Sequence, residues 1–174
     1  MSPSKPPASA AAAYLGLGSN LGDRRAHLSE ALRRLHGHPG IRVVAASSLY
    51  ATAPVGLEGP EFLNAAAKIE TELEPDALLD ACLAVEQELG RVRGPGPQSR
   101  TIDIDLLVYG GVERSGERLA LPHPRMTRRA FALLPLAEIA PDLIVAGRSV
   151  ADWAAAADLT GVRVSDNPAS WASV

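Results

Sequence analysis

Two aspartates stand two positions apart in the segment Arg100-Thr-Ile-Asp-Ile-Asp-Leu-Leu-Val-Tyr109. The alternation of polar and apolar residues predicts a strand that turns Asp103 and Asp105 to one face and Ile102 and Ile104 to the core. Carboxylates about 6.5 to 7 Å apart at Cα repel each other unless a cation lies between them. Mg²⁺ prefers a few hard oxygen ligands, with water and phosphate in its other positions. The pair therefore indicates a magnesium site, with a half-exposed strand of solvated acids as the alternative.

Arginines flank this strand on both sides. Residues 91–129 contain eight arginines and four acidic residues, a net charge of +4 in a chain whose net charge is −3. Guanidinium groups bind phosphate through paired hydrogen bonds, and a rigid imidazole can donate to it as well. A site that gathers carboxylates and guanidinium groups suits a metal-phosphate substrate, whereas any one arginine taken alone is expected at the solvated surface. The basic residues concerned are Arg91, Arg93, Arg100, Arg118, His123, Arg125, Arg128 and Arg129.

The chain has only two phenylalanines, Phe62 and Phe131, and both stand beside polar residues. Aromatic rings can stack on a flat heterocycle, and the amide of the nearby Asn64 can both donate to and accept from the edge of such a ring. These three residues therefore predict a heterocycle pocket. Packing of the two rings in the core is the alternative interpretation.

Composition excludes several other classes. The chain has no Gly-Lys pair and so no Walker A loop, and Leu21 breaks the dinucleotide-binding glycine pattern. Its net charge of −3 argues against general nucleic-acid binding, and no apolar run reaches the length of a membrane span. A single cysteine, Cys82, excludes an internal disulfide and fits a reducing compartment, so we expect a cytoplasmic protein without a secretory signal.

Apolar periodicity and turn residues predict the elements that must position these side chains. We expect a strand from residue 13 into the glycine-rich turn 18–22, a helix capped by Asp23, strands at 41–50, 62–71 and 101–109, and a helix at 75–89. This order predicts an antiparallel α+β sandwich with a βαββαβ core and both helices on one face. Residues 91–99 are expected to form a mobile loop.

The ends of the chain complete this interpretation. Residues 1–12 predict a disordered tail, and residues 13–174 a single domain. After residue 110 we expect a loop-rich excursion, a short helix near 128–134 and a terminal helix that contains Trp153.

Five segments of the chain resemble the 6-hydroxymethyl-7,8-dihydropterin pyrophosphokinases of folate biosynthesis. They are Gly18-Ser-Asn-Leu-Gly22, Phe62-Leu-Asn64, Gly90-Arg-Val-Arg93, Arg100-Thr-Ile-Asp-Ile-Asp-Leu106 and Leu121-Pro-His-Pro124, which continues to Arg129 and Phe131. The resemblance spans residues 14–142. It implies a ferredoxin-like fold and transfer of diphosphate from ATP to the pterin hydroxymethyl oxygen, with release of AMP.

The resemblance also implies a role for each matching residue. Asp103 and Asp105 would hold two Mg²⁺ ions on ATP. Either Asp103 or Asp105 is the candidate acceptor of the hydroxymethyl proton, and the sequence does not distinguish between them. Arg91, Arg100, Arg118, His123 and Arg129 would contact phosphates, Arg91 and Arg100 taking part in catalysis, with Arg93 contributed by a mobile loop. Phe62 and Phe131 would enclose the pterin, together with Asn64 and the backbone around Thr52 and Val55. Glu86 matches a family position at the nucleotide site, with an ordinary surface acid as the alternative.

The chain departs from the family pattern at residues 94–99, where a tryptophan is usual and none is present. We therefore expect altered ATP affinity or turnover. The other function classes are a non-catalytic ferredoxin-like nucleotide or metabolite binding module and an RNA-recognition domain, which needs exposed aromatics on its central strands. We expect the protein to be a monomer that binds the small-molecule substrates ATP and hydroxymethyl-dihydropterin. We expect no nucleic-acid or membrane partner.

Overall fold

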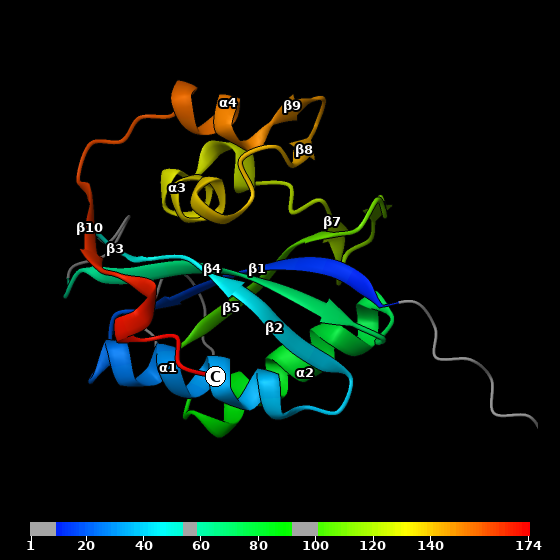
Figure 1. Ribbon diagram of the computed structural model, residues 1–174, viewed down its shortest axis with the longest axis horizontal. Coiled ribbons are helices and arrows are strands. Elements are labelled where there is room, and N and C mark those ends of the chain that lie inside the picture. Colours follow the sequence, from blue (N-terminus) through cyan, green and yellow to red (C-terminus); the bar gives the residue numbers. More distant parts are fainter. Residues whose placement is uncertain (1–9, 54–58, 92–100) are drawn as a thin grey trace, which may run out of the picture.

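A six-stranded antiparallel sheet separates two helical layers in the computed structural model, which describes residues 10–53, 59–91 and 101–174. Helices α1 and α2 cover one face, and α3 and α4 cover the other (Figure 1). Each face of the sheet therefore packs against a different part of the chain.

The sheet order is β10-β3-β4-β1-β5, and β2 also pairs with β4. All of these pairs are antiparallel. The two longest strands, β1 and β4, pair along their length at the centre. The elements of this layer and the helices beneath it are β1 (Ala11–Ser19), α1 (Arg24–Gly37), β2 (Ile41–Ala46), β3 (Leu49–Thr52), β4 (Phe62–Thr71), α2 (Pro75–Glu88) and β5 (Asp103–Tyr109).

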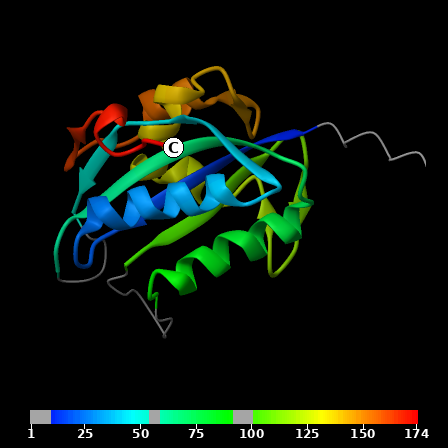
Figure 2. The ribbon, with the colours of Figure 1, turned by 60° about the horizontal axis from the view of Figure 1, so that its bottom comes forward.

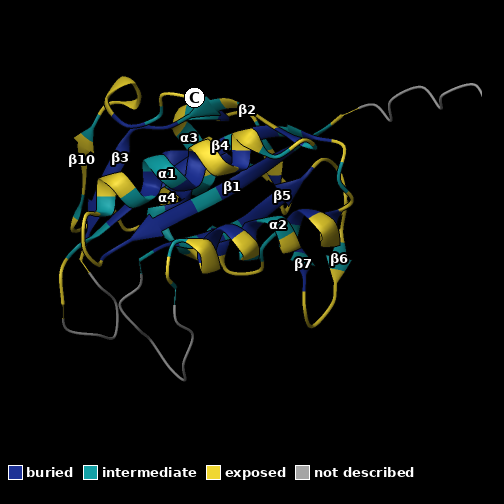
Figure 3. Ribbon diagram, turned by 90° about the horizontal axis from the view of Figure 1, so that it is seen from below, coloured by how far each residue is buried: buried dark blue, intermediate teal, exposed yellow. Residues whose placement is uncertain are grey.

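Helices α1 and α2 begin at the signals that the sequence carries. The Asp23 carboxylate accepts the backbone N–H of Ala26 at 3.1 Å and caps α1, and Pro75 occupies the first turn of α2. The leucines of α1 recur at helical spacing and are buried against the sheet (Figure 3). Figure 2 shows the two helices side by side across this face.

Cys82 lies on the buried side of α2. Burial, with smaller contributions from Glu86 and Asp105, raises the pKa of the Cys82 thiol to about 12. The thiol therefore stays protonated near neutral pH and is a packing residue.

A second apolar cluster lies on the opposite face of the sheet. Leu107 packs there with Met126, Leu136 and Val150, which belong to η1 (Met126–Arg128), α3 (Ala130–Ile139) and α4 (Val150–Ala156). The short hairpin of β8 (Ile144–Val145) with β9 (Arg148–Ser149) joins α3 to α4. A second hairpin, β6 (Arg114–Ser115) with β7 (Ala120–Leu121), lies beside α2, where Arg114 pairs with Asp76. Within the described ranges, no helix is long and apolar enough to span a membrane.

Several expected boundaries were wrong. The strand expected at 41–50 is split into β2 and β3, because Ser47 turns inward and exchanges hydrogen bonds with Ala66. The expected helix 128–134 is a 3-10 turn followed by the longer α3. The helix that contains Trp153 is not terminal: β10 (Val162–Asp166) and η2 (Pro168–Ser170) follow it.

The start of the first strand also differs from the expectation. β1 begins at Ala11, and Ala11 and Ala12 pair with Thr71 and Glu70, so the strand takes up the last two residues of the expected tail. Residues 1–9 lie outside the described part. The single domain of residues 13–174 stays a prediction.

Candidate active site

The two aspartates of β5 share one face of the strand. Asp103 and Asp105 are half-buried, whereas Ile104 and Leu106 are each 3% exposed and belong to the main core, together with buried residues of α1 and α2. The alternation expected for this strand is confirmed. Both carboxylates therefore lie on the α3 side of the sheet, where Leu107 of the same strand joins the second apolar cluster.

Glycines of β1 lie beside these carboxylates. Gly18 pairs with Asp103 and Gly16 with Asp105, and on the other side of β1 Gly18 pairs with Asn64 of β4. A Cβ atom at Gly18 would stand only 2.7 Å from the Asn64 Oδ1 atom. The absence of a side chain at Gly18 therefore leaves room for the Asn64 amide over β1.

The Asn64 side chain has a second fixed contact. It is 6% exposed, and its Nδ2 donates to the Thr52 hydroxyl at 2.8 Å. Phe62 lies two residues earlier on β4, with its Cδ1 atom 3.8 Å from a Cβ position at Gly18. Thr52, Phe62 and Asn64, expected together from the sequence, thus lie together.

A buried acid holds Arg91 beside Asp103. Glu86 is 2% exposed and accepts the backbone N–H of Ile104 at 2.7 Å. The Arg91 Nη1 atom lies 2.9 Å from Glu86 and 2.7 Å from Asp103. The alternative interpretation of Glu86 as a surface acid is therefore wrong: it fixes α2 to β5 between the two aspartates.

His123 follows the hairpin β6–β7 in the chain and lines the same cleft as Arg91. Burial first, then the positive charges of Arg129 and Arg125, lower the pKa of His123, although Asp103 acts in the other direction. Its Nδ1 atom accepts the backbone N–H of Arg125 at 3.2 Å. A neutral ring in this arrangement carries its proton on Nε2, which can then donate to a ligand oxygen.

Arg129 and Phe131 stand at the start of α3. The Arg129 guanidinium lies over the Phe131 ring, with 5.4 Å between its Cζ atom and the ring centroid. A cation over a ring face is attracted by the ring quadrupole, so the contact orients both side chains.

Two cavities meet at the carboxylates. A wide cleft of about 710 Å³ lies between α2, β5 and the β6–β7 hairpin, and its walls include Leu79, Leu83, Glu86, Arg91, Arg118 and Arg125. A small cavity of about 30 Å³ lies between the sheet and α3, against Asn64 and Phe131. Asp103, Asp105, His123 and Arg129 line both.

Arg118 stands at the rim of the wide cleft, where carboxylates of α2 hold it. Its guanidinium pairs with Asp80 and, at 3.4 Å, with Asp76, and all three side chains are more than half exposed. Asp76 also accepts a hydrogen bond from Arg114, and this bond, with that from Arg118, lowers the pKa of Asp76. Exposed pairs of this kind are weak, so Arg118 can exchange these partners for a ligand.

Three expected site residues, Val55, Arg93 and Arg100, lie outside the described ranges, as does the loop 94–99 without tryptophan. Conversely, Leu79 and Leu83, one turn apart on α2, line the wide cleft although no role was expected for them. Helical spacing places these two leucines on one side of the helix, but it could not show that this side borders a cavity.

The donor set at the junction suits a hard cation. The described residues contain no group of three or more acidic, histidine or cysteine side chains placed to hold a metal. Two carboxylates would leave most positions of a bound ion to water or phosphate. This is the pattern that Mg²⁺ favours, so the residues fit such an ion.

Comparisons with known proteins agree with this geometry. The family model described as 7,8-dihydro-6-hydroxymethylpterin-pyrophosphokinase matches residues 14–141. Proteins named 2-amino-4-hydroxy-6-hydroxymethyldihydropteridine pyrophosphokinase are similar: that of Methylorubrum extorquens is 52% identical over 151 residues, which cover 86% of this chain and 96% of the relative. That of Bacillus subtilis is 43% identical over 153 residues, with coverages of 87% and 89%.

Solved structures show the same fold. A Plasmodium falciparum HPPK-DHPS structure aligns with a TM-score of 0.68 at 15% identity, over 87% of this chain but only 46% of that longer chain. By its family model and its relatives, the chain belongs to the 7,8-dihydro-6-hydroxymethylpterin-pyrophosphokinase family.

Proposed function

We infer that this protein performs the reaction of its family. It transfers the β,γ-diphosphate of ATP to the hydroxymethyl oxygen of 6-hydroxymethyl-7,8-dihydropterin and releases AMP, a step of tetrahydrofolate biosynthesis. The observation that carries the assignment is the junction of two cavities at Asp103 and Asp105. A reaction between a triphosphate and a flat heterocycle needs two adjoining sites with cations where they meet.

The small cavity is the proposed pterin side. The Asn64 amide would bond the polar edge of the ring, and Phe62 and Phe131 would stack on its faces. A space of about 30 Å³ is smaller than a pterin, so side chains that line the cavity must shift when the substrate enters. Thr52 holds the Asn64 amide in place through its hydroxyl. The expected role of the backbone at Val55 stays a prediction.

The wide cleft is the proposed nucleotide side. Its volume of about 710 Å³ is within the usual range of ligand sites. Leu79 and Leu83 offer an apolar wall for the base, and Arg91, Arg118, Arg129 and His123 offer positive charge and donors to the phosphates. Glu86 would act by holding Arg91 and β5. The predictions that Arg93 and Arg100 contact phosphate concern residues outside the described ranges.

Asp103 and Asp105 are the proposed ligands of two Mg²⁺ ions. Such ions would neutralise charge on the triphosphate and on the departing AMP. The protein itself holds the attacking oxygen in line with the β-phosphorus, excludes water and orients the phosphates. The hydroxymethyl proton must also leave, and Asp103 or Asp105 is the nearest candidate acceptor among the described residues.

We also propose that the core is of the ferredoxin-like class. With β2 and β3 counted as one interrupted strand, the order of β1, α1, β2–β3, β4, α2 and β5 is βαββαβ, with the first and third strands central. A chain with these antiparallel pairs and both crossover helices on one face matches that arrangement. A single domain that acts as a monomer is part of the same proposal.

The other function classes fit less well. An RNA-recognition domain needs exposed aromatic side chains on its central strands. Here the central strand β1 has Gly16 and Gly18 next to the aspartates of the edge strand β5. A non-catalytic nucleotide-binding module has no need of a heterocycle pocket that meets the phosphate side at two acids.

The assay that tests the function mixes the protein with ATP, Mg²⁺ and 6-hydroxymethyl-7,8-dihydropterin and measures AMP and the pterin diphosphate. We expect stoichiometric formation of both, and a loss of at least about a hundredfold in kcat for Asp105→Asn. Binding of ATP without AMP release would instead identify a binding module. Asp142→Asn, an exposed acid outside both cavities, is the matched control.

A further inference from the structure

Residues 162–171, here called the C-terminal strap, run from the α4 side of the sheet to the α1 side. The strap comprises β10, η2 and Trp171. In Figure 1 it is the red segment that passes the edge of the sheet beside β3. It lies beyond residues 14–141, which the family model matches.

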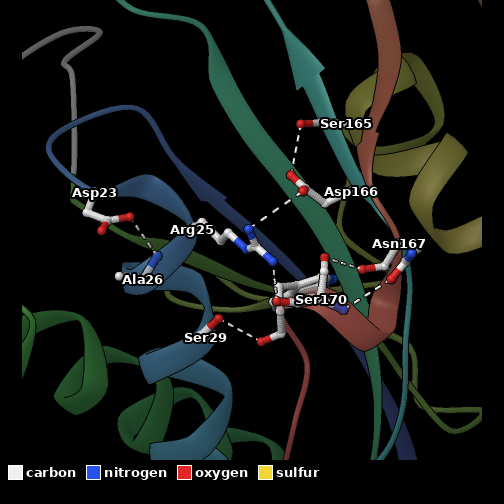
Figure 4. A network of polar contacts seen from close by, with 9 residues as sticks. Asp23, Arg25, Ala26, Ser29, Ser165, Asp166, Asn167 and Ser170 are labelled. Carbon is white, nitrogen blue, oxygen red and sulfur yellow. Dashed lines mark hydrogen bonds and ion pairs between the residues drawn. The ribbon is translucent and has the colours of Figure 1, made fainter.

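One end of the strap is anchored on α1 and on the turn between β2 and β3. Trp171 is 3% exposed, and its Nε1 donates to the Ser47 carbonyl at 2.9 Å. The Ser29 hydroxyl donates to the Trp171 carbonyl at 2.6 Å. Arg25 donates to the Ser170 carbonyl and lies 3.8 Å from Asp166 (Figure 4). The buried indole therefore anchors this end of the strap, and several polar contacts hold it in place.

The other end of the strap pairs with the strand that carries Thr52. Val162 is the partner of Thr52, and Val164 is the partner of Tyr50. The Arg163 guanidinium lies 2.9 Å from the Glu61 carboxylate, next to Phe62. The strap thus holds residues at both ends of the connection between β3 and β4.

This arrangement bears on the heterocycle pocket. β3 has four residues, and without β10 it would be an edge strand paired with β4 alone. Thr52 is the hydrogen-bond partner of the Asn64 amide, so a displacement of β3 displaces the group that orients Asn64. The chemistry of the pocket then depends on a segment that supplies none of the described residues lining the small cavity.

We propose that the C-terminal strap positions the pterin half of the site, and that Trp171 and Arg163 are positioning residues for Thr52 and Phe62. The proposal rests on the proposed function for its substrate. The proposal separates the two halves of the site: loss of the anchor weakens pterin binding and leaves nucleotide binding intact. The reason is that the strap is held by α1, β3, the turn before β3 and Glu61, whereas α2, β5 and the β6–β7 hairpin border the nucleotide side.

Trp171→Ala tests the anchor, and Trp153→Ala is its matched control. Trp153 is the other tryptophan of the chain, and its Nε1 also donates to a backbone carbonyl, that of Val145 at 2.7 Å, but on α4 away from β3. We expect Trp171→Ala to raise the KM for the pterin roughly tenfold with an unchanged KM for ATP, as a shift in substrate position does. Trp171→Phe, which keeps the packing, should recover most of this loss. Trp153→Ala should leave both KM values unchanged.

Two further measurements keep the test decisive. If Trp171→Ala does not fold, Arg163→Ala at the exposed side of β10 should raise the pterin KM alone, by a smaller factor. Hydrogen exchange of the amides of residues 49–52 should speed up in Trp171→Ala and not in Trp153→Ala. Equal pterin KM values and equal exchange in the two tryptophan variants would overturn the proposal. An inactive wild-type protein would reject the proposed function, and the exchange measurement would still decide the role of the strap.

Discussion

Arg91 stands between two carboxylates, a buried one on α2 and a half-buried one on β5. A buried charge is tolerated only when it is paired and hydrogen-bonded. Glu86 meets both conditions, since it pairs with Arg91 and accepts the Ile104 N–H. The same contacts fix the backbone between Asp103 and Asp105, so the stability of this contact and the geometry of the site are linked.

Glu86→Ala should lower the free energy of unfolding by about 2 to 4 kcal/mol, because the Ile104 N–H loses its acceptor and Arg91 loses one partner. Glu86→Gln should cost less, since an amide oxygen can still accept that N–H. Urea unfolding measures both. Glu88→Ala is the matched control on the same helix: its exposed pair with Arg34 is worth under about 1 kcal/mol. An equal decrease in the free energy of unfolding for Glu86→Ala and Glu88→Ala would contradict this role of Glu86.

At the scale of elements, the register of three strands builds the site floor. β1 places Gly18 between Asn64 on β4 and Asp103 on β5, so a position without a side chain separates the Asn64 amide from the proposed metal ligand Asp103. A shift by one residue would turn these side chains to the opposite face. The site thus depends on pairing between strands that are distant in the sequence.

Gly18→Ala should weaken pterin binding, because the new Cβ would lie 2.7 Å from the Asn64 Oδ1 atom and must displace the amide. We expect the KM for the pterin to rise about tenfold or more. Gly111→Ala, where the Cβ meets open space, is the control. Steady-state kinetics with each substrate varied in turn measures the effect, and an unchanged pterin KM would show that Asn64 does not bind the ring.

Helix α3 is tied to the junction of β2 and β3 by one acid. Glu138 accepts the backbone N–H of Ser48 and, at 3.1 Å, the hydroxyl of Tyr50. Burial, followed by the charge of Glu138, raises the pKa of Tyr50 to about 12. The contact joins the layer that carries Phe131 to the strand that carries Thr52.

This link predicts a loss of stability at alkaline pH. Above pH 10 the unfolded chain releases the Tyr50 proton while the folded chain retains it, so the unfolded state binds fewer protons and the free energy of unfolding falls as pH rises toward 12. The share of Tyr50 is up to about 2 to 3 kcal/mol. Tyr50→Phe should flatten the decline, and Glu138→Gln should reduce it in part. Unfolding curves between pH 9 and 12 that coincide for the wild type and Tyr50→Phe, after correction for their offset, would refute it.

At the scale of the whole molecule, the two faces of the sheet have different roles: one forms the main core and the other borders the small cavity. One face packs α1 and α2 into the main core, and the other shares its surface between α3 and the small cavity. The wide cleft opens beside α2 and β5, across the edge strand. A ligand that filled both cavities would therefore contact α2, the sheet and α3 together.

Nucleotide binding should raise the melting temperature of the whole protein. A non-hydrolysable ATP analogue with Mg²⁺ at about a hundred times its Kd adds about 2.7 kcal/mol, which for a chain of this size is roughly 5 to 10 °C. The increase should shrink in Asp103→Asn and Asp105→Asn and persist in Asp142→Asn. Differential scanning calorimetry measures it. The same increase without Mg²⁺ would contradict a metal site at the two aspartates.

Local sequence patterns determined much of this protein. Polar and apolar alternation turned Asp103 and Asp105 to one face, helical spacing marked the buried leucines of α1, and Asp23 and Pro75 marked helix starts. Each of these depends on neighbours within a turn or a strand. The five family motifs, each contained in a short segment, likewise predicted the family, which the family model over residues 14–141 shows.

Tertiary structure alone decided how these segments meet. The burial of Glu86, the pairing of Arg118 with α2 carboxylates, the break at Ser47 and the addition of β10 beside β3 all arise from contacts between residues far apart in the chain. A surface acid and a buried one can have the same sequence neighbours, because only the strand packed against the helix decides which faces water. Periodicity within a segment carries no information about that partner.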